Sequence, residues 1–182
     1  IYALASSGLS LTYGLLRILN FAHGHIMMVG AYLFYWASTE LGLGLAASGV
    51  VTAIGTILVA VLTLNVFVMP FTRFSFFLAF VTTLAFSIML ESVVSMVFGV
   101  NVKSLTTGVD ISSYEIYGIF ITPIQIVIIV SAIVLLSGLA FVIHSTSIGR
   151  RIRAVSEFRS GAEALGISTK KISYVVFIVG CL

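Results

Sequence analysis

The sequence predicts an all-α protein, a polytopic bundle of transmembrane helices. The chain of 182 residues is 60% hydrophobic and only 8% charged, with a mean hydropathy of +1.22. Soluble domains carry about 25% charged residues, so this composition is typical of a membrane protein. Several apolar runs also approach the ~20 residues that a helix needs to span a bilayer. Short polar breaks separate these runs, and the chain has only two prolines.

The apolar runs predict five spanning helices and the beginning of a sixth. In order, they are a first helix ending near Leu16, then residues 18–38, 45–69, 76–98 and 118–143, and a sixth helix that begins near Ile172. We expect the third helix to stop at Pro70, because proline lacks the N–H needed to continue a helix.

Both ends of the sequence fall within apolar runs. Residue 1 is isoleucine, and the last residues read "YVVFIVGCL". We interpret residues 1–182 as a single transmembrane domain that lacks both ends, with no signal peptide at its start. The single cysteine, Cys181, excludes an internal disulfide.

The distribution of charge predicts the orientation of the chain. Residues 144–171 contain six Lys or Arg and two Glu, a net charge of +4. The polar loop at residues 99–117 contains one Lys and two acidic residues, a net charge of −1. The positive-inside rule therefore predicts that residues 144–171 are cytoplasmic and residues 99–117 external. Counting back along the chain, Arg17 and Arg73 both fall on the cytoplasmic side.

The segment at residues 144–171 is too polar to span a membrane, and its apolar residues are regularly spaced. Spacings of three and four predict one apolar helix face formed by Ile152, Val155, Phe158, Ala162 and Leu165. Gly166 is suited to a helix C-terminus. We expect one or two short amphipathic helices here. Such a face can lie on the membrane surface or dock on a cytosolic partner, and the pattern leaves both open.

Two stretches resemble a known family: "YGLLRILNFAHGHIMMVGAYLFY" near the start and "GRRIRAVSEFRSGAEALGIS" further on. The family motifs are NFAHG at residues 20–24, GAY at 30–32 and GRxxRA at 149–154. They occur in the expected order, and the resemblance extends over nearly the whole chain. The sequence is therefore similar to the LivH-type permease subunits of branched-chain amino acid ABC importers.

The resemblance implies a multi-pass subunit of the prokaryotic plasma (inner) membrane that works with several partners. These are a second, LivM-like permease subunit, two cytosolic ATPase subunits and an external substrate-binding protein. The chain is also expected to contact the lipid bilayer and not to bind nucleic acid. Residues 144–171 correspond to the family's cytoplasmic coupling loop. The coupling residues implied are Arg153, Phe158, Ala162, Glu163, Leu165 and Gly166.

The chain has no nucleotide site of its own that the sequence can identify. The P-loop pattern G-x-x-x-x-G-K-[ST] is absent from the sequence. We therefore expect a transport subunit that is not an enzyme and binds no cofactor, with ATP used by its partner subunits.

The stretch "ILNFAHGHIMMVG" at residues 18–30 places Asn20, His23, Gly24 and His25 inside an apolar run. The two histidines are two residues apart and point to different helix faces, and no acidic residue or cysteine is close in sequence, which argues against a metal site. Gly24 permits a helix break, and interrupted spans often mark a transport site. The alternative is a short cytoplasmic turn over residues 17–25. Position 25 often carries an acid in the family, so His25 is a departure.

Glu91 is an ionisable residue inside the fourth predicted span, where a charge costs roughly 2.5 to 3.5 kcal/mol on insertion scales. It either makes a structural hydrogen bond to a neighbouring helix or lines the substrate path near the ammonium group of an amino acid. The hypothetical path residues are thus Asn20, His23, Gly24, His25 and Glu91.

The function expected is inward transport of branched-chain or similar amino acids by an ABC importer. Two alternatives stay open: a urea or short-amide permease of the same family, and a secondary transporter or channel that works alone.

Overall fold

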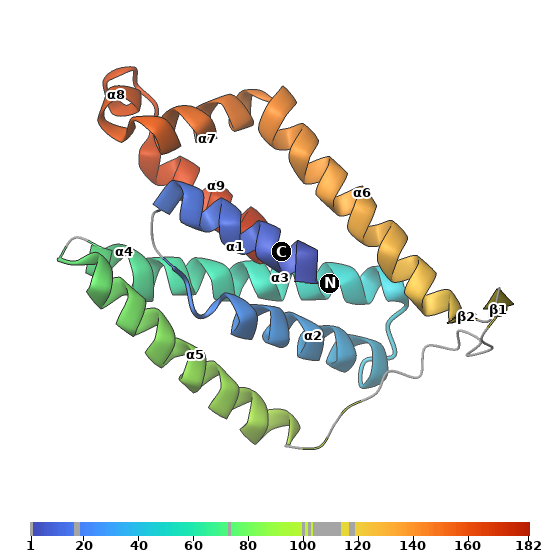
Figure 1. Ribbon diagram of the computed structural model, residues 1–182. Helices are drawn as coiled ribbons and strands as arrows, with labels where there is room; N and C mark the ends of the chain where they lie inside the picture. The colour runs from blue at the N-terminus through green and yellow to red at the C-terminus, as the bar shows by residue number, and fades with distance from the viewer. Residues whose placement is uncertain are drawn as a thin grey trace.

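The chain forms a bundle of helices with one short β-hairpin (Figure 1). The computed structural model describes residues 2–16, 19–72, 74–99, 101, 103, 114–116 and 119–182. Its helices are α1 (Tyr2–Leu16), α2 (His23–Thr39), α3 (Leu45–Leu62), the π-helix η1 (Thr63–Val68), α4 (Met69–Thr72), α5 (Phe76–Phe98), α6 (Pro123–Ser145), α7 (Ser147–Glu157), α8 (Arg159–Ala164) and α9 (Thr169–Cys181). Strands β1 (Tyr114–Ile116) and β2 (Ile119–Ile121) pair in antiparallel register.

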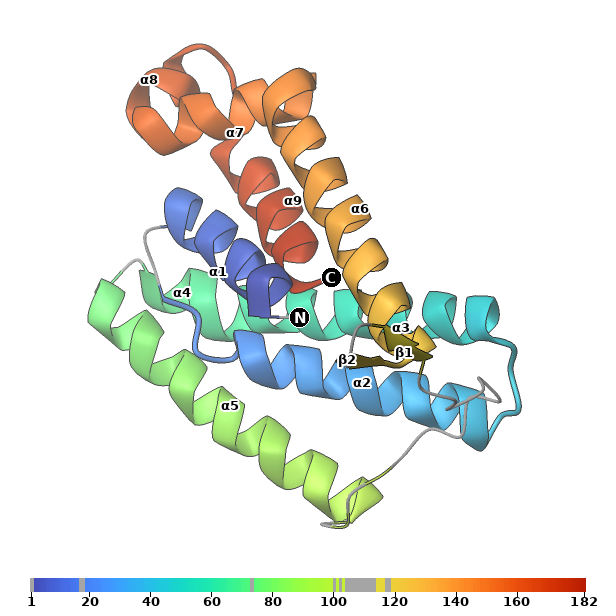
Figure 2. The same cartoon turned by 45° about the vertical axis from the view of Figure 1, so that its right-hand side comes forward.

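The bundle has two distinct ends (Figures 1 and 2). Helices α7 and α8 lie at one end, which we call the α7–α8 end, together with the turn between α4 and α5. The β-hairpin and the beginning of α6 lie at the other end. Residues 144–171, which we call the basic segment, and the described part of the loop at residues 99–117 therefore lie at opposite ends of the bundle. Arg17 and Arg73 lie outside the described residues.

Three helices are long and apolar enough to cross a membrane, by length and composition, within the part of the chain that the structure describes. They are Leu45–Thr72, Phe76–Phe98 and Pro123–Ser145. The predicted all-α transmembrane bundle is confirmed. Helices α1, α2 and α9 have only 15, 17 and 13 residues, fewer than the ~20 of a full span. The predicted end of the first helix near Leu16 is confirmed, whereas the second helix, predicted over residues 18–38, begins only at His23.

Two clusters of buried side chains hold the helices together. The larger joins α2, η1, α5 and α9 through residues such as Ile26, Leu64, Phe86 and Phe177. The smaller packs α7 and α8 on α1 and α9 through Leu15, Ile152, Val155, Ala162, Ile172 and Val176. Helix α6 has no buried residue although it is predominantly apolar, so its surface is suited to lipid or to another membrane helix.

The expected helix end at Pro70 is not observed. Residues Leu45–Thr72 form one helical rod in which Pro70 lies inside α4. The π-helix η1 precedes it, and the Met69 N–H donates to the Leu64 carbonyl, five residues back. Since the hydrogen-bond register has already widened before Pro70, the rod tolerates a residue with no N–H.

The fifth span is predicted to begin at residue 118, before the start of the observed helix α6. Residues 119–121 belong to β2, and α6 begins only at Pro123. Thr122 and Gln125 form a capping box ahead of a proline in the first turn, an arrangement that fixes a helix start.

Candidate functional site

A tight turn fixed by Asn20 directly precedes α2. The Ala22 N–H donates to Asn20 Oδ1 at 3.1 Å, and the His23 N–H donates to the Asn20 carbonyl at 3.2 Å. An Asn side chain that accepts from the backbone two residues on is a recurrent way to make such a turn. Helix α2 therefore begins at His23. Gly24 and His25 lie in its first turn. The hypothesis that the helix breaks at Gly24 is therefore wrong, because the non-helical backbone ends before His23.

The start of α2 lies deep in the bundle. His23 Nε2 is 3.1 Å from the carbonyl oxygen of Ala5, which is eleven residues from the end of α1 at Leu16. At 1.5 Å per residue, His23 is about 16 Å in from that end, roughly half of a 30 Å hydrocarbon core. The geometry thus favours a turn re-entering the bundle over a short turn at its surface.

The end of α9 reaches the same depth. Cys181 Sγ is 4.0 Å from His23 Nδ1, and Cys181 is twelve residues from the start of α9, about 18 Å along the helix. Because Nε2 donates to the Ala5 carbonyl, Nδ1 of a neutral imidazole is left to accept from the thiol. His23 therefore connects α1, α2 and α9.

This junction depends on two glycines that the sequence analysis did not single out. A Cβ on Gly180 would lie 2.7 Å from Thr12 Cγ2 and 2.9 Å from the Gly8 carbonyl oxygen. A Cβ on Gly8 would collide with the Gly180 carbonyl oxygen. Close backbone approach between helices is the usual role of glycine in membrane bundles.

We expect Gly8→Ala to lower the stability of the protein by about 1–3 kcal/mol, because the added methyl meets backbone that cannot move aside alone. The measurement is the apparent melting temperature of the purified protein in detergent. Gly14→Ala is the matched control, since a Cβ on Gly14 meets no atom of the described residues within 4 Å. Equal melting temperatures for the two variants would contradict the packing role of Gly8.

A pocket of about 290 Å³ opens beside the turn, and we call it the α1–α2 pocket. It is lined by Ala5, Ser6, Leu9, Leu19, Asn20, Phe21, His23, Gly24 and Met27. Its volume is at the lower end of the range of ligand sites, ~300–1,000 Å³, and is suited to a small molecule.

Asn20 gives this pocket a polar group with unused capacity. The residue is 4% exposed, and its Nδ2 has no hydrogen-bond partner among the described residues. A buried donor left without a partner costs about 1–3 kcal/mol. A hydrogen-bond acceptor brought to this atom, such as a carboxylate, would satisfy the donor.

The structure brings together two of the predicted path residues from different helices. His25 Nε2 on α2 is 3.7 Å from Glu91 Oε2 on α5. Glu91 is fifteen residues from the start of α5, about 22 Å along the helix. Its side chain is 64% exposed within this chain. Glu91 thus has a partner on a neighbouring helix and still presents its carboxylate to the surroundings.

The basic segment forms two helices that meet at a sharp bend. The backbone leaves the helical conformation at Phe158 (φ −145°, ψ 88°), and Gly166 has φ +77° after α8, the left-handed conformation common at helix C-termini. Ala162 is buried, whereas Phe158 and Leu165 are 67% and 82% exposed. The prediction of one apolar helix face is therefore wrong for Phe158 and Leu165, because the bend at Phe158 separates α7 from α8.

Polar contacts fix this segment to the bundle. Glu163 Oε1 accepts a hydrogen bond from Thr169 Oγ1 at 2.6 Å and is 3.8 Å from Arg159 Nε. Arg153 Nη1 donates to the Ile143 carbonyl near the end of α6. Phe158 and Leu165 thus project from a segment that is tied to both α6 and α9.

One contact was missed by the sequence analysis although a signal existed. The Tyr174 hydroxyl of α9 donates to Asn65 Oδ1 in η1. Asn65 stands alone in the apolar run "TLNVFVMP", and an isolated amide there indicates a polar partner on another helix.

Comparisons with known proteins give a consistent result. A family model described as "Branched-chain amino acid transport system / permease component" matches residues 1–182. The chain is 29% identical over 192 residues to the high-affinity branched-chain amino acid transport system permease protein LivH of Salmonella typhimurium. It is 27% identical to LivH of Escherichia coli K12 and 24% identical to BraD of Pseudomonas aeruginosa, each over 191 residues.

The three alignments cover 98% of this chain and 62% of each relative, so the chain spans less than two thirds of their length. No solved structure gives a significant match.

Proposed function

The chain belongs to the family of branched-chain amino acid transport permease components, and from this premise we propose that it forms part of an ABC importer that moves branched-chain or similar amino acids inward. The relatives are named as permeases of high-affinity branched-chain amino acid transport. The observation that carries the proposal for this chain is the buried Asn20 Nδ2, which has no hydrogen-bond partner among the described residues and belongs to a residue that lines a largely apolar pocket at mid-depth.

The chemistry of the α1–α2 pocket corresponds to the parts of an apolar amino acid. The Asn20 amide would donate to the carboxylate of the substrate. Leu9, Leu19, Phe21 and Met27 offer an apolar surface to a branched side chain. Glu91 lies further along, beside His25, and its carboxylate would attract the ammonium group as the substrate passes.

The proposed partners are a second permease subunit, an external substrate-binding protein and two cytosolic ATPase subunits that supply ATP hydrolysis. The basic segment at residues 144–171 is then the cytoplasmic side of a prokaryotic plasma membrane protein. Its two exposed apolar residues, Phe158 and Leu165, would enter the ATPase surface. The contacts that tie α7 to α6 and α8 to α9 would transmit closure of the ATPases to the bundle.

Transport in reconstituted vesicles tests this proposal. With both permeases, the ATPases and the binding protein present, we expect ATP-dependent accumulation of leucine, isoleucine or valine and no accumulation of urea. Uptake that persists without the ATPase subunits would indicate a secondary transporter or channel. Accumulation of urea in place of amino acids would indicate an amide permease.

We expect Glu91→Gln to lower leucine uptake about tenfold, because the neutral amide loses the charge attraction for the ammonium group, an interaction of about 1.5 kcal/mol. Initial rates of ATP-dependent uptake provide the measurement. Glu40→Gln is the matched control, since Glu40 is an exposed residue at the far end of α2. An unchanged rate in Glu91→Gln would assign Glu91 a structural role only.

A further inference from the structure

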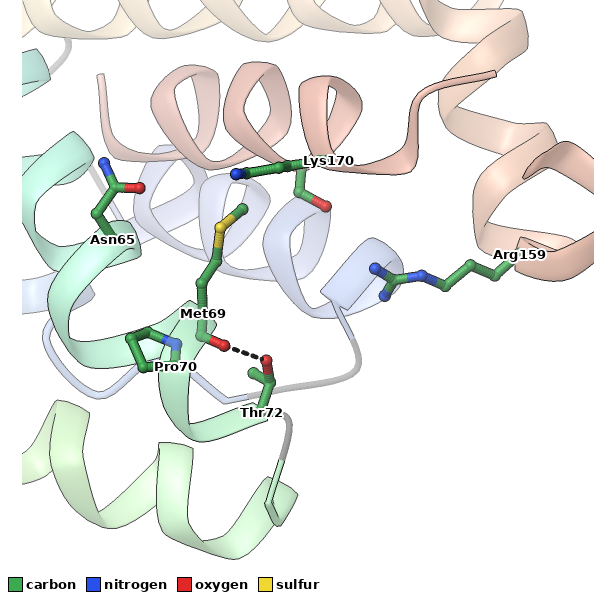
Figure 3. Close-up of a pocket in the computed structure, with 7 residues that line it drawn as sticks. Asn65, Met69, Pro70, Thr72, Arg159 and Lys170 are labelled. Atoms are coloured by element: carbon green, nitrogen blue, oxygen red, sulfur yellow. Dashed lines mark hydrogen bonds between the residues drawn. The ribbon is translucent and has the colours of Figure 1, made fainter. Parts of the chain in front are cut away.

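The α7–α8 end contains a second pocket, of about 490 Å³, that the proposed transport path does not use. It is lined by Asn65, Met69, Pro70, Thr72, Arg159, Lys170 and Ser173. In Figure 3, Arg159 extends from α8 toward the pocket and Lys170 extends from α9 across Met69, with Pro70 and Thr72 on the side of α4. We call it the basic pocket.

The polar groups of the basic pocket favour an anion. Among the described residues, its lining includes two cations and no acidic side chain. Within the part of the chain that the structure describes, the acidic group that Arg159 contacts is Glu163, whose Oε1 lies 3.8 Å from Arg159 Nε and also accepts from Thr169. Among the described residues, no acceptor or acidic group pairs with the Lys170 ammonium.

The hydroxyl groups of the pocket are already committed as donors within the protein. Thr72 Oγ1 donates to the Met69 carbonyl and Ser173 Oγ donates to the Thr169 carbonyl, each at 2.9 Å. The two cationic side chains and the amide nitrogen of Asn65 are therefore the side-chain donors available to a ligand among the described lining residues. A guanidinium and an ammonium that line one pocket are suited to a phosphate group.

The surroundings of the pocket indicate where such a phosphate comes from. The spanning rod Leu45–Thr72 ends at the pocket, and α5 begins close to it. Three phenylalanines at this turn are strongly exposed: Phe74 at 80%, Phe76 at 62% and Phe77 at 71%. Exposed apolar side chains beside a basic pocket at the end of spanning helices match a membrane surface, where acyl chains and headgroups meet.

We propose that the basic pocket binds a phosphate group, as carried by an anionic phospholipid headgroup, through Arg159 and Lys170. This site goes beyond the transport function, because it involves neither the α1–α2 pocket nor Glu91. It provides a contact by which anionic lipid holds α8 and α9 against α4.

Native mass spectrometry of the purified transporter in detergent tests the site. The probes are phosphatidylglycerol, phosphatidylcholine and inorganic phosphate. We expect phosphatidylglycerol to bind more tightly than the zwitterionic lipid. The double variant Arg159→Gln/Lys170→Gln should weaken phosphatidylglycerol binding about tenfold or more, since each basic residue near the surface contributes about 1 kcal/mol.

The matched control is Arg151→Gln/Lys171→Gln, which removes two exposed cations from the same segment outside the pocket. If the pocket double variant does not assemble, Lys170→Gln alone is used, since its ammonium has no partner among the described side chains, and a weakening of about fivefold is expected.

Equal binding of the two lipids, or an equal loss in the control variant, would overturn the proposal. Displacement of phosphatidylglycerol by millimolar inorganic phosphate would show that the ligand is free phosphate, and it would contradict the proposal that the phosphate belongs to a lipid headgroup.

Discussion

Replacing Asn20 with alanine is expected to lower the rate of ATP-dependent leucine uptake about ten- to hundredfold, because a hydrogen bond to a charged carboxylate contributes about 1.5–3 kcal/mol. The alanine variant also loses the acceptor that fixes the turn before α2. Asn20→Asp separates the two roles, since it keeps an oxygen for the Ala22 N–H and removes only the Nδ2 donor. We expect its uptake to fall as far as that of Asn20→Ala.

Asn101→Ala is the control for this pair, because Asn101 is an exposed asparagine that does not line the pocket. Assembly is followed for each variant by the yield of intact transporter. If Asn20→Asp assembles and transports at the normal rate, the Nδ2 donor has no part in transport, and Asn20 serves only the turn.

Truncation of Phe158 or Leu165 to alanine is expected to weaken binding of the ATPase subunit about thirtyfold for each substitution, the size typical of a central apolar anchor at an interface. Both side chains are largely exposed in this chain. The stability of the permease should therefore change little. The dissociation constant of purified ATPase from permease in nanodiscs provides the measurement.

Ile148→Ala is the matched control for these truncations. Ile148 is 45% exposed near the start of α7 and lies away from the bend at Phe158. Unchanged affinity in both Phe158→Ala and Leu165→Ala would move the docking surface elsewhere on the chain.

Most of the helices could be predicted from the sequence, because long apolar runs leave few alternatives to a helix. The predicted span at residues 76–98 coincides with α5. The predicted helix end at Pro70 is wrong for a physical reason. The rule that proline ends a helix applies to a regular α-helix, whereas η1 changes the hydrogen-bond register ahead of Pro70. The hairpin before Pro123 was missed because Ile119, Phe120 and Ile121 suit either a strand or a span.

The sequence identifies which residues belong to the candidate site, but it predicts only part of how these residues are arranged in space. Polar residues in an apolar run identify Asn20 and Glu91, since such residues are costly in lipid. The contact between His25 and Glu91 joins helices that are far apart in sequence, so no local pattern indicates it. The periodicity of residues 152–165 assumed one continuous helix, and the bend at Phe158 could not be read from spacing.

The depth of the turn is the result that matters most for function. Contacts from Ala5 to His23 and from His23 to Cys181 place the start of α2 near the middle of the bundle. A re-entrant backbone at this depth needs partners that lipid cannot supply, and it is tolerated where it is buried in protein or lines a cavity. The α1–α2 pocket provides such a cavity.

The claim that the substrate passes through the α1–α2 pocket is tested most directly by cysteine labelling in the assembled transporter. Ser6→Cys places a thiol in the pocket, and Ser10→Cys places one on the same helix facing α6. The native Cys181 is buried. The account predicts that leucine delivered by the binding protein slows modification at position 6 and leaves position 10 unchanged. Equal labelling rates at position 6 with and without leucine would contradict it.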